Sequence, residues 1–110
     1  MWFRSGLIIL VVAACCSVAG AIPRCGDQAR KDAFNLLKFH VNNDGRAELA
    51  DGVTQLPSVA NPAKKKQKFD VIEVWGYVYK GQYRMRMIYF YFNDKECVLM
   101  GQEILEYASL

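Results

Sequence analysis

The sequence from residue 69 to residue 92 reads FDVIEVWGYVYKGQYRMRMIYFYF. Its β-branched and aromatic residues favour strands, and Lys80-Gly81-Gln82 interrupts it with a turn. Successive side chains of a strand point to opposite faces, so the second half of the stretch has two faces. One face holds Tyr83, Met85, Met87, Tyr89 and Tyr91, and the other holds Arg84, Arg86, Ile88, Phe90 and Phe92. The stretch predicts two antiparallel strands, at residues 69–79 and 83–92.

A third strand follows in the sequence. The turn residues 93–96 precede a run from Cys97 to about Glu106 that completes an antiparallel meander. The arginine-bearing face becomes apolar at Ile88, so one end of the sheet is either covered on both faces or offers an apolar surface to a partner. The uncharged residues 87–92 predict a central strand that would self-associate if exposed. Both a monomer and a dimer that exchanges hairpins between chains remain open.

A helix is predicted before the strands, with Asp27 as its N-cap and residues 42–45 as its end. Its apolar stripe at three- and four-residue spacing comprises Ala29, Ala33, Leu36, Leu37, His40 and Val41. Residues 46–68 contain two prolines and read as a connector, with at most one helical turn at residues 47–50. The predicted class is α+β, with one N-terminal amphipathic helix packed on an antiparallel β-meander.

Residues 1–21 have the pattern of a cleaved secretory signal. Arg4 precedes a short apolar run, and the small residues 19–21 (Ala-Gly-Ala) end it. Cleavage after Ala21 would leave residues 22–110 as one secreted, extracellular domain with no stable membrane insertion. That domain retains only Cys25 and Cys97, which predicts one disulfide; closing a loop this long stabilises a fold by roughly 4 kcal/mol.

Charge gives one local signal. The chain has 14 basic and 11 acidic residues, and without Arg4 the net charge of +2 is too small to indicate nucleic-acid binding. However, Lys64, Lys65, Lys66 and Lys68 form a basic cluster. A solvated loop is its simplest interpretation. Contact with an anionic surface, or dibasic cleavage of a secreted precursor, are the alternatives.

No catalytic or metal-binding constellation is visible in the sequence. His40 is the single histidine and lies on the apolar stripe of the predicted helix, where a hydrogen-bonded structural role fits best. The two mature cysteines are better used in a disulfide, so a zinc site lacks ligands. The sequence therefore predicts a binding protein rather than an enzyme, with no cofactor and no metal.

The hairpin sequence Tyr77-Val78-Tyr79-Lys80-Gly81 and the order of elements resemble the cystatin superfamily. Inhibitors of that family carry Gln-x-Val-x-Gly in their first hairpin, and here the glycine matches strictly. The resemblance implies a cystatin-like fold in which these five residues bind a protein target, with a papain-like cysteine protease as the most specific candidate. The chain departs from the family in lacking a Pro-Trp pair after Cys97, and its Gly26 directly adjoins the helix.

Two further hypotheses stand beside inhibition. A secreted ligand- or surface-binding factor would use the aromatic sheet face, Arg84, Arg86 and the lysine cluster to hold a lipid headgroup, a glycan or another anionic surface. A signalling precursor would be cut at the lysine run.

Overall fold

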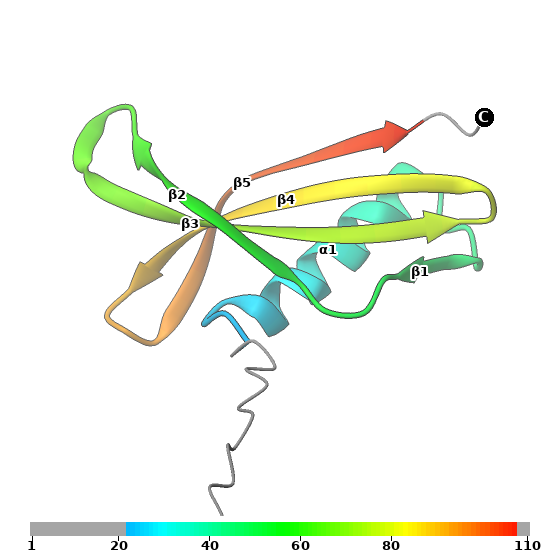
Figure 1. The fold of residues 1–110 in the computed structure, drawn as a ribbon, viewed down its shortest axis with the longest axis horizontal. Helices are drawn as coiled ribbons and strands as arrows, with labels where there is room; N and C mark the ends of the chain where they lie inside the picture. The colour runs from blue at the N-terminus through cyan, green and yellow to red at the C-terminus, as the bar shows by residue number, and fades with distance from the viewer. Residues whose placement is uncertain (1–21, 108–110) are drawn as a thin grey trace, which may run out of the picture.

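The computed structural model describes residues 22–107, which form one helix and one five-stranded antiparallel sheet (Figure 1). The elements are α1 (Gly26–His40), β1 (Ala47–Leu49), β2 (Thr54–Asn61), β3 (Lys64–Val78), β4 (Gly81–Phe92) and β5 (Glu96–Tyr107). The predicted α+β class is confirmed, with the helix ahead of the strands in the chain. The signal predicted at residues 1–21 lies outside the described residues.

The strand order is β1-β3-β4-β5, and β2 also pairs with β3. β1 lies opposite residues 76–78 of β3 and β2 opposite residues 64–73, so the two short strands follow one another along the same side of β3. β5 forms the opposite edge of the sheet. The central pair, β3 and β4, is therefore hydrogen-bonded on both sides, as the composition of residues 87–92 predicted.

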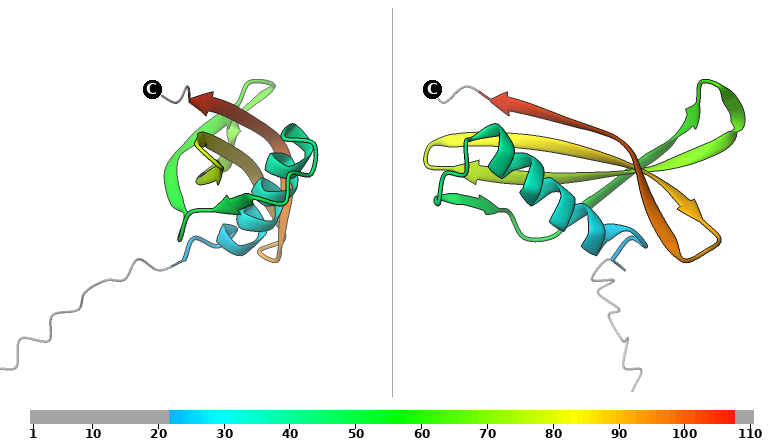
Figure 2. Two further views of the ribbon diagram at one scale, coloured as in Figure 1. Left: turned by 90° about the vertical axis from the view of Figure 1, so that its right-hand side faces the viewer. Right: turned by 180° about the vertical axis from the view of Figure 1, so that it is seen from behind.

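The core lies between α1 and the concave side of the curled sheet, which wraps around the helix (Figure 2). Ala29, Ala33 and Leu37 are fully buried on one stripe of α1. They pack against sheet residues in the same core cluster, including Ile72, Val74, Val78, Tyr83, Met85, Met87 and Tyr89. The predicted apolar face of β4 is confirmed, because its alternate residues from Tyr83 to Tyr89 are all buried.

The start of α1 differs from the sequence prediction, whereas its left-handed end agrees with it. The Gly26 amide donates to the Pro23 carbonyl at 2.7 Å, and this turn starts the helix at Gly26 with Cys25 as N-cap, so the prediction of Asp27 was wrong. At the other end Asn42 and Asn43 have φ of 55° and 59°, which confirms a left-handed helix end. His40 is exposed and meets the Tyr83 ring edge-on at 5.6 Å, which corrects its placement on the buried stripe.

The prediction of a connector at residues 46–68 was also wrong, because β1, β2 and the start of β3 occupy it. β2 is exposed at most positions and so lacks the alternation that reveals a half-buried strand. Pro57 lies where the register shifts between Leu56 and Val59. A proline has no amide proton to give to the ladder, and such an irregularity is where a strand tolerates one.

The disulfide between Cys25 and Cys97 is present, with a Cα–Cα distance of 5.8 Å. It joins the residue before α1 to the second residue of β5. Cys25 is 1% exposed and belongs to the core cluster. The predicted pairing is confirmed, and it fixes the N-terminal end of the helix to the β4–β5 hairpin.

A second, smaller apolar cluster lies on the face of the sheet away from α1. Val71 stands opposite Ile88 and Leu56 in the register, and both Val71 and Phe69 are buried there without help from the helix. The Phe69 and Phe90 rings meet edge-on with centres 6.4 Å apart. The change from arginine to apolar residues at Ile88 thus marks the start of a part of the sheet that is buried on both faces.

Candidate binding surfaces

The hairpin between β3 and β4 turns through two residues, Tyr79 and Lys80, because Val78 pairs with Gly81. Tyr79 has φ of 56°, a left-handed conformation that is uncommon for a residue with a large side chain. Its side chain is 71% exposed, with the Arg46 guanidinium carbon 4.9 Å and the Lys80 ammonium 5.5 Å from the ring centre. The left-handed residue of this turn is therefore Tyr79.

Of the five hairpin residues predicted to bind a target, two project from the sheet. Tyr77 and Val78 pair with Glu48 and Ala47 of β1, and Val78 is buried. Gly81 is packed rather than exposed, because a Cβ there would lie 3.1 Å from the Tyr83 ring and 3.3 Å from the Val78 carbonyl oxygen. The accessible part of the hairpin consists of Tyr79 and Lys80.

Side-chain contacts hold this end of the molecule together. The Tyr83 hydroxyl donates to Glu106 at 2.6 Å, and this hydrogen bond, together with desolvation and the carboxylate charge, raises the pKa of Tyr83. Next to the tip, Arg46 binds Asp44 at 2.8 Å through its side chain and also donates its backbone amide. These bonds to the charged carboxylate lower the pKa of Asp44 to about 2.

The basic cluster lies on the β2–β3 arm, which we define as residues 54–68. Lys64, Lys65, Lys66 and Lys68 are exposed, and they belong to the first residues of strand β3 rather than to a loop. Asn61 donates to Gln67 at 2.6 Å and accepts from the Ala63 amide, which orders the tip of the arm.

The structure does not join Arg84 and Arg86 to the lysine cluster. Arg86 lies between Glu73 at 3.1 Å and Glu103 at 3.8 Å, on the sheet face away from α1. Arg84 donates to the Tyr107 hydroxyl at 3.0 Å, and the Tyr107 ring lies 5.4 Å from that of Trp75. Because the two glutamates already compensate Arg86, this face does not form one continuous basic surface with the arm.

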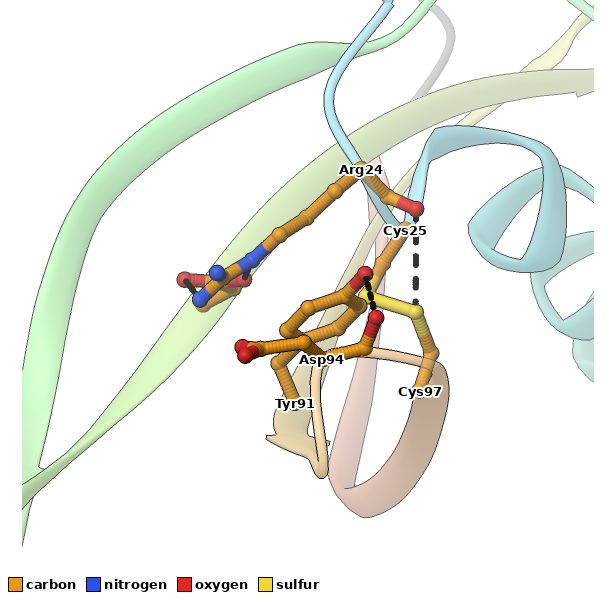
Figure 3. Close-up of polar contacts among 6 residues, drawn as sticks. Arg24, Cys25, Tyr91, Asp94 and Cys97 are labelled. Carbon is orange, nitrogen blue, oxygen red and sulfur yellow. Dashed lines mark hydrogen bonds and ion pairs between the residues drawn. A yellow bond between two sulfur atoms is a disulfide. The ribbon is translucent and has the colours of Figure 1, made fainter.

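Near the disulfide, the segment before α1 is fixed to the sheet by Arg24 (Figure 3). Its guanidinium donates to both carboxylate oxygens of Asp70, at 2.7 and 3.3 Å, and lies 4.1 Å from the centre of the Tyr91 ring. The Asp70 hydrogen bond is the main cause of a raised Arg24 pKa. Tyr91 in turn donates to the Asp94 carbonyl at 2.8 Å. Cys97 Sγ lies 3.7 Å from the Arg24 carbonyl oxygen, a contact without a proton since the sulfur is in the disulfide.

These surfaces lie at two ends of the sheet (Figure 1). The Tyr79–Lys80 tip lies at one end, beside β1 and the C-terminal end of α1. The β2–β3 arm and the β4–β5 turn lie at the other end, where they diverge, and the disulfide ties the segment before α1 to that end. The sequence prediction missed the arm because β2 has no apolar alternation, although Asn61-Pro62 was an available turn signal. No local signal could reveal the Arg24–Asp70 pair, whose members are 46 residues apart.

Within residues 22–107, no three metal-ligating side chains converge on one point.

Asp32 accepts a hydrogen bond from the buried Tyr89 hydroxyl at 2.6 Å and one from Gln28 at 3.0 Å. Burial and this hydrogen bond raise the pKa of Tyr89. In the same described range, no helix is long and apolar enough to cross a membrane.

Comparison of the chain with models of protein families, with curated proteins and with solved structures finds no match. The hairpin at residues 77–81 joins β3 to β4 and follows the β2–β3 hairpin, whereas the family pattern lies in the first hairpin. The likeness to cystatins therefore rests on the order of the elements.

Proposed function

We propose that the protein is a secreted, non-enzymatic binding domain of cystatin-like layout whose target is another protein. Its most specific activity would be reversible inhibition of a papain-like cysteine protease. The observation that carries the proposal is Tyr79, an aromatic side chain that is 71% exposed at a projecting hairpin tip. Exposed aromatic anchors are typical of the residues that dominate protein–protein binding energy.

The form of the tip also suits a cleft. A two-residue turn is narrow. One strand of this hairpin, β3, is hydrogen-bonded to β1 on its outer side and to β4 within the hairpin. A hairpin fixed in this way enters a groove without losing much conformational entropy on binding. Lys80 beside the ring adds positive charge, whereas Arg46 is already paired with Asp44. The charge of Lys80 favours a target whose groove is rimmed by carboxylates.

The opposite end of the sheet is an alternative surface for binding the same protein target. At that end lie the tip of the β2–β3 arm (residues 61–64), the segment before α1 and the β4–β5 turn. The arm tip lacks an aromatic residue, so the Tyr79 tip is the better anchor.

The test is titration of oxidised protein, residues 22–110, against papain and a lysosomal cathepsin, with residual hydrolysis of a small substrate as the readout. Tyr79→Asn is the informative variant, because asparagine tolerates the left-handed conformation while the aromatic anchor is lost. We expect stoichiometric inhibition by the native protein and at least about a tenfold weaker inhibition by the variant.

Phe92→Asn is the matched control, since it removes an exposed aromatic side chain at the far end of β4. It should inhibit like the native protein. Substitution of Gly81 is unsuitable, because any side chain there would displace Tyr83. Loss of inhibition in Pro62→Asp but not in Tyr79→Asn would move the contact to the β2–β3 arm, and no inhibition by folded native protein would reject the protease as the target.

A further inference from the structure

The charge of the β2–β3 arm is not compensated by the rest of the described fold. Residues 54–68 contain four lysines and no acidic residue. All four lysine side chains are exposed, and none forms an ion pair with a carboxylate of residues 22–107. A structural role in the fold therefore does not account for these four charges.

The next carboxylate along β3 is also unavailable to them. Asp70 is held by both hydrogen bonds from Arg24, and its side chain is only 12% exposed. The acidic residues of the β4–β5 turn, Asp94 and Glu96, belong to a hairpin that diverges from the arm (Figure 1). The arm thus presents a local charge of +4 to solvent, although the whole chain carries only +3.

We infer that the β2–β3 arm binds a linear sulfated polysaccharide. The four lysines fall within residues 64–68 at the start of β3, where the ladder with β2 is irregular because the register shifts between Ala60 and Asn61. Their charges are therefore concentrated near the tip of the arm and do not all point to one face. Such a cluster matches a polymer with repeated anionic groups better than a single phosphate. Lysine ammonium groups are point charges on flexible stems and need no fixed anion geometry. Release of counterions from the polymer would drive the association.

The composition of the arm disfavours two other polyanions. Contact with a membrane is strengthened by large apolar side chains that insert, whereas the tip consists of Asn61, Pro62 and Ala63. A single-stranded nucleic acid would require aromatic side chains for base stacking, and residues 54–68 include none. The site lies at the other end of the sheet from Tyr79, so this inference stands whether or not the proposed protease contact does.

The chain supplies a matched pair of variants. Four lysines lie on the arm, and the remaining four are Lys31, Lys38, Lys80 and Lys95. Replacing either set with glutamine changes the net charge by the same amount. The probe is heparin, measured by calorimetry and by elution from an immobilised column across a series of salt concentrations, with circular dichroism to verify the fold.

We expect the arm variant (K64Q, K65Q, K66Q and K68Q) to lose at least about tenfold in affinity and to lower the salt slope by roughly three to four, since each neutralised contact contributes close to one. The control variant should keep most of its affinity. Lys65→Gln with Lys66→Gln provides a milder second test, with about half the change in slope.

Equal weakening by both fourfold variants would overturn the inference, because net charge rather than the arm would then be responsible. Stronger binding to phosphatidylserine vesicles or to a single-stranded oligonucleotide than to a heparin oligosaccharide at the same salt would overturn the choice of ligand.

Discussion

Gly76 of β3 packs directly against Leu37 of the helix. A Cβ at this position would be 2.8 Å from Leu37 Cδ2, 3.0 Å from Met85 Cε and 3.3 Å from the Glu48 carbonyl oxygen. Two of these neighbours are fully buried and the third is backbone, so none can move at low cost. The glycine is needed for space rather than for its backbone freedom.

We predict that Gly76→Ala lowers the free energy of unfolding by about 1–3 kcal/mol, because an extra methyl group in a packed core forces its neighbours to shift. Urea denaturation followed by tryptophan fluorescence measures this loss. Gly101→Ala is the control, since its nearest heavy atom would lie 3.5 Å away, in ordinary contact. A loss as large in Gly101→Ala as in Gly76→Ala would contradict the packing argument.

Two of the six tyrosines carry a raised pKa, and this predicts sensitivity to alkali. Tyr89 is fully buried and donates to Asp32, while Tyr83 donates to Glu106. A folded-state pKa above the unfolded value of about 10 gives stability that is complete below pH 10 and is lost as pH rises through the folded value. We therefore expect the free energy of unfolding to fall above about pH 10.

Absorbance at 295 nm during an alkaline titration measures the phenolates directly. Tyr89→Phe should remove a late-titrating phenolate and reduce the loss of stability above pH 10. If Tyr89→Phe instead reduces the absorbance change near pH 10, the Tyr89 hydroxyl titrates like an ordinary tyrosine, which would contradict its raised pKa.

Among the elements, the β2–β3 arm and the remainder of β3 should differ in local stability. Residues 54–68 are mostly exposed, whereas residues 71, 72, 74 and 78 of β3 are buried between neighbours. Few buried apolar contacts permit local opening. We predict that amides of the arm exchange with deuterium at least about tenfold faster than those of residues 70–78. Equal protection in peptide-resolved mass spectrometry would show that the arm opens only with the whole sheet.

The same contrast explains what the sequence predicts at this scale. α1, β3 and β4 each bury one face, so their apolar periods appear in the sequence. The prediction places α1 and β4 within a few residues of their bounds but starts β3 at residue 69 instead of 64, because residues 64–68 are mostly exposed. β5 is mostly exposed as well, and it was predicted from the turn residues before it. β1 has three residues and β2 is exposed at most positions, so neither leaves a periodic signal. Of the candidate surfaces, the hairpin tip is local and was predictable. The separation of the two ends depends on β2 pairing with β3, which no local pattern encodes.

For the fold of residues 22–107 as a whole, the disulfide is a covalent constraint between its first and last elements. Cys25 and Cys97 are 72 residues apart, and the bridge limits the entropy of the unfolded chain accordingly. We predict that the Cys25→Ser, Cys97→Ser double variant loses roughly 4 kcal/mol of unfolding free energy, much of what a small domain possesses. Guanidinium denaturation measures this loss of free energy. Native protein with its disulfide reduced should show a loss of the same size. A loss of unfolding free energy below about 1 kcal/mol would mean that the packing around Cys25 maintains stability without the disulfide.

The position of the bridge also has a consequence for biosynthesis. Cys25 precedes every described helix and strand, whereas Cys97 lies in the last of them. At about 5–20 residues per second, a ribosome needs several seconds to pass from one codon to the other. During that interval Cys25 lacks its native partner. Closure of the bond in a cell therefore reports that Cys97 has been translated, and alkylation of free thiols during synthesis would date that moment.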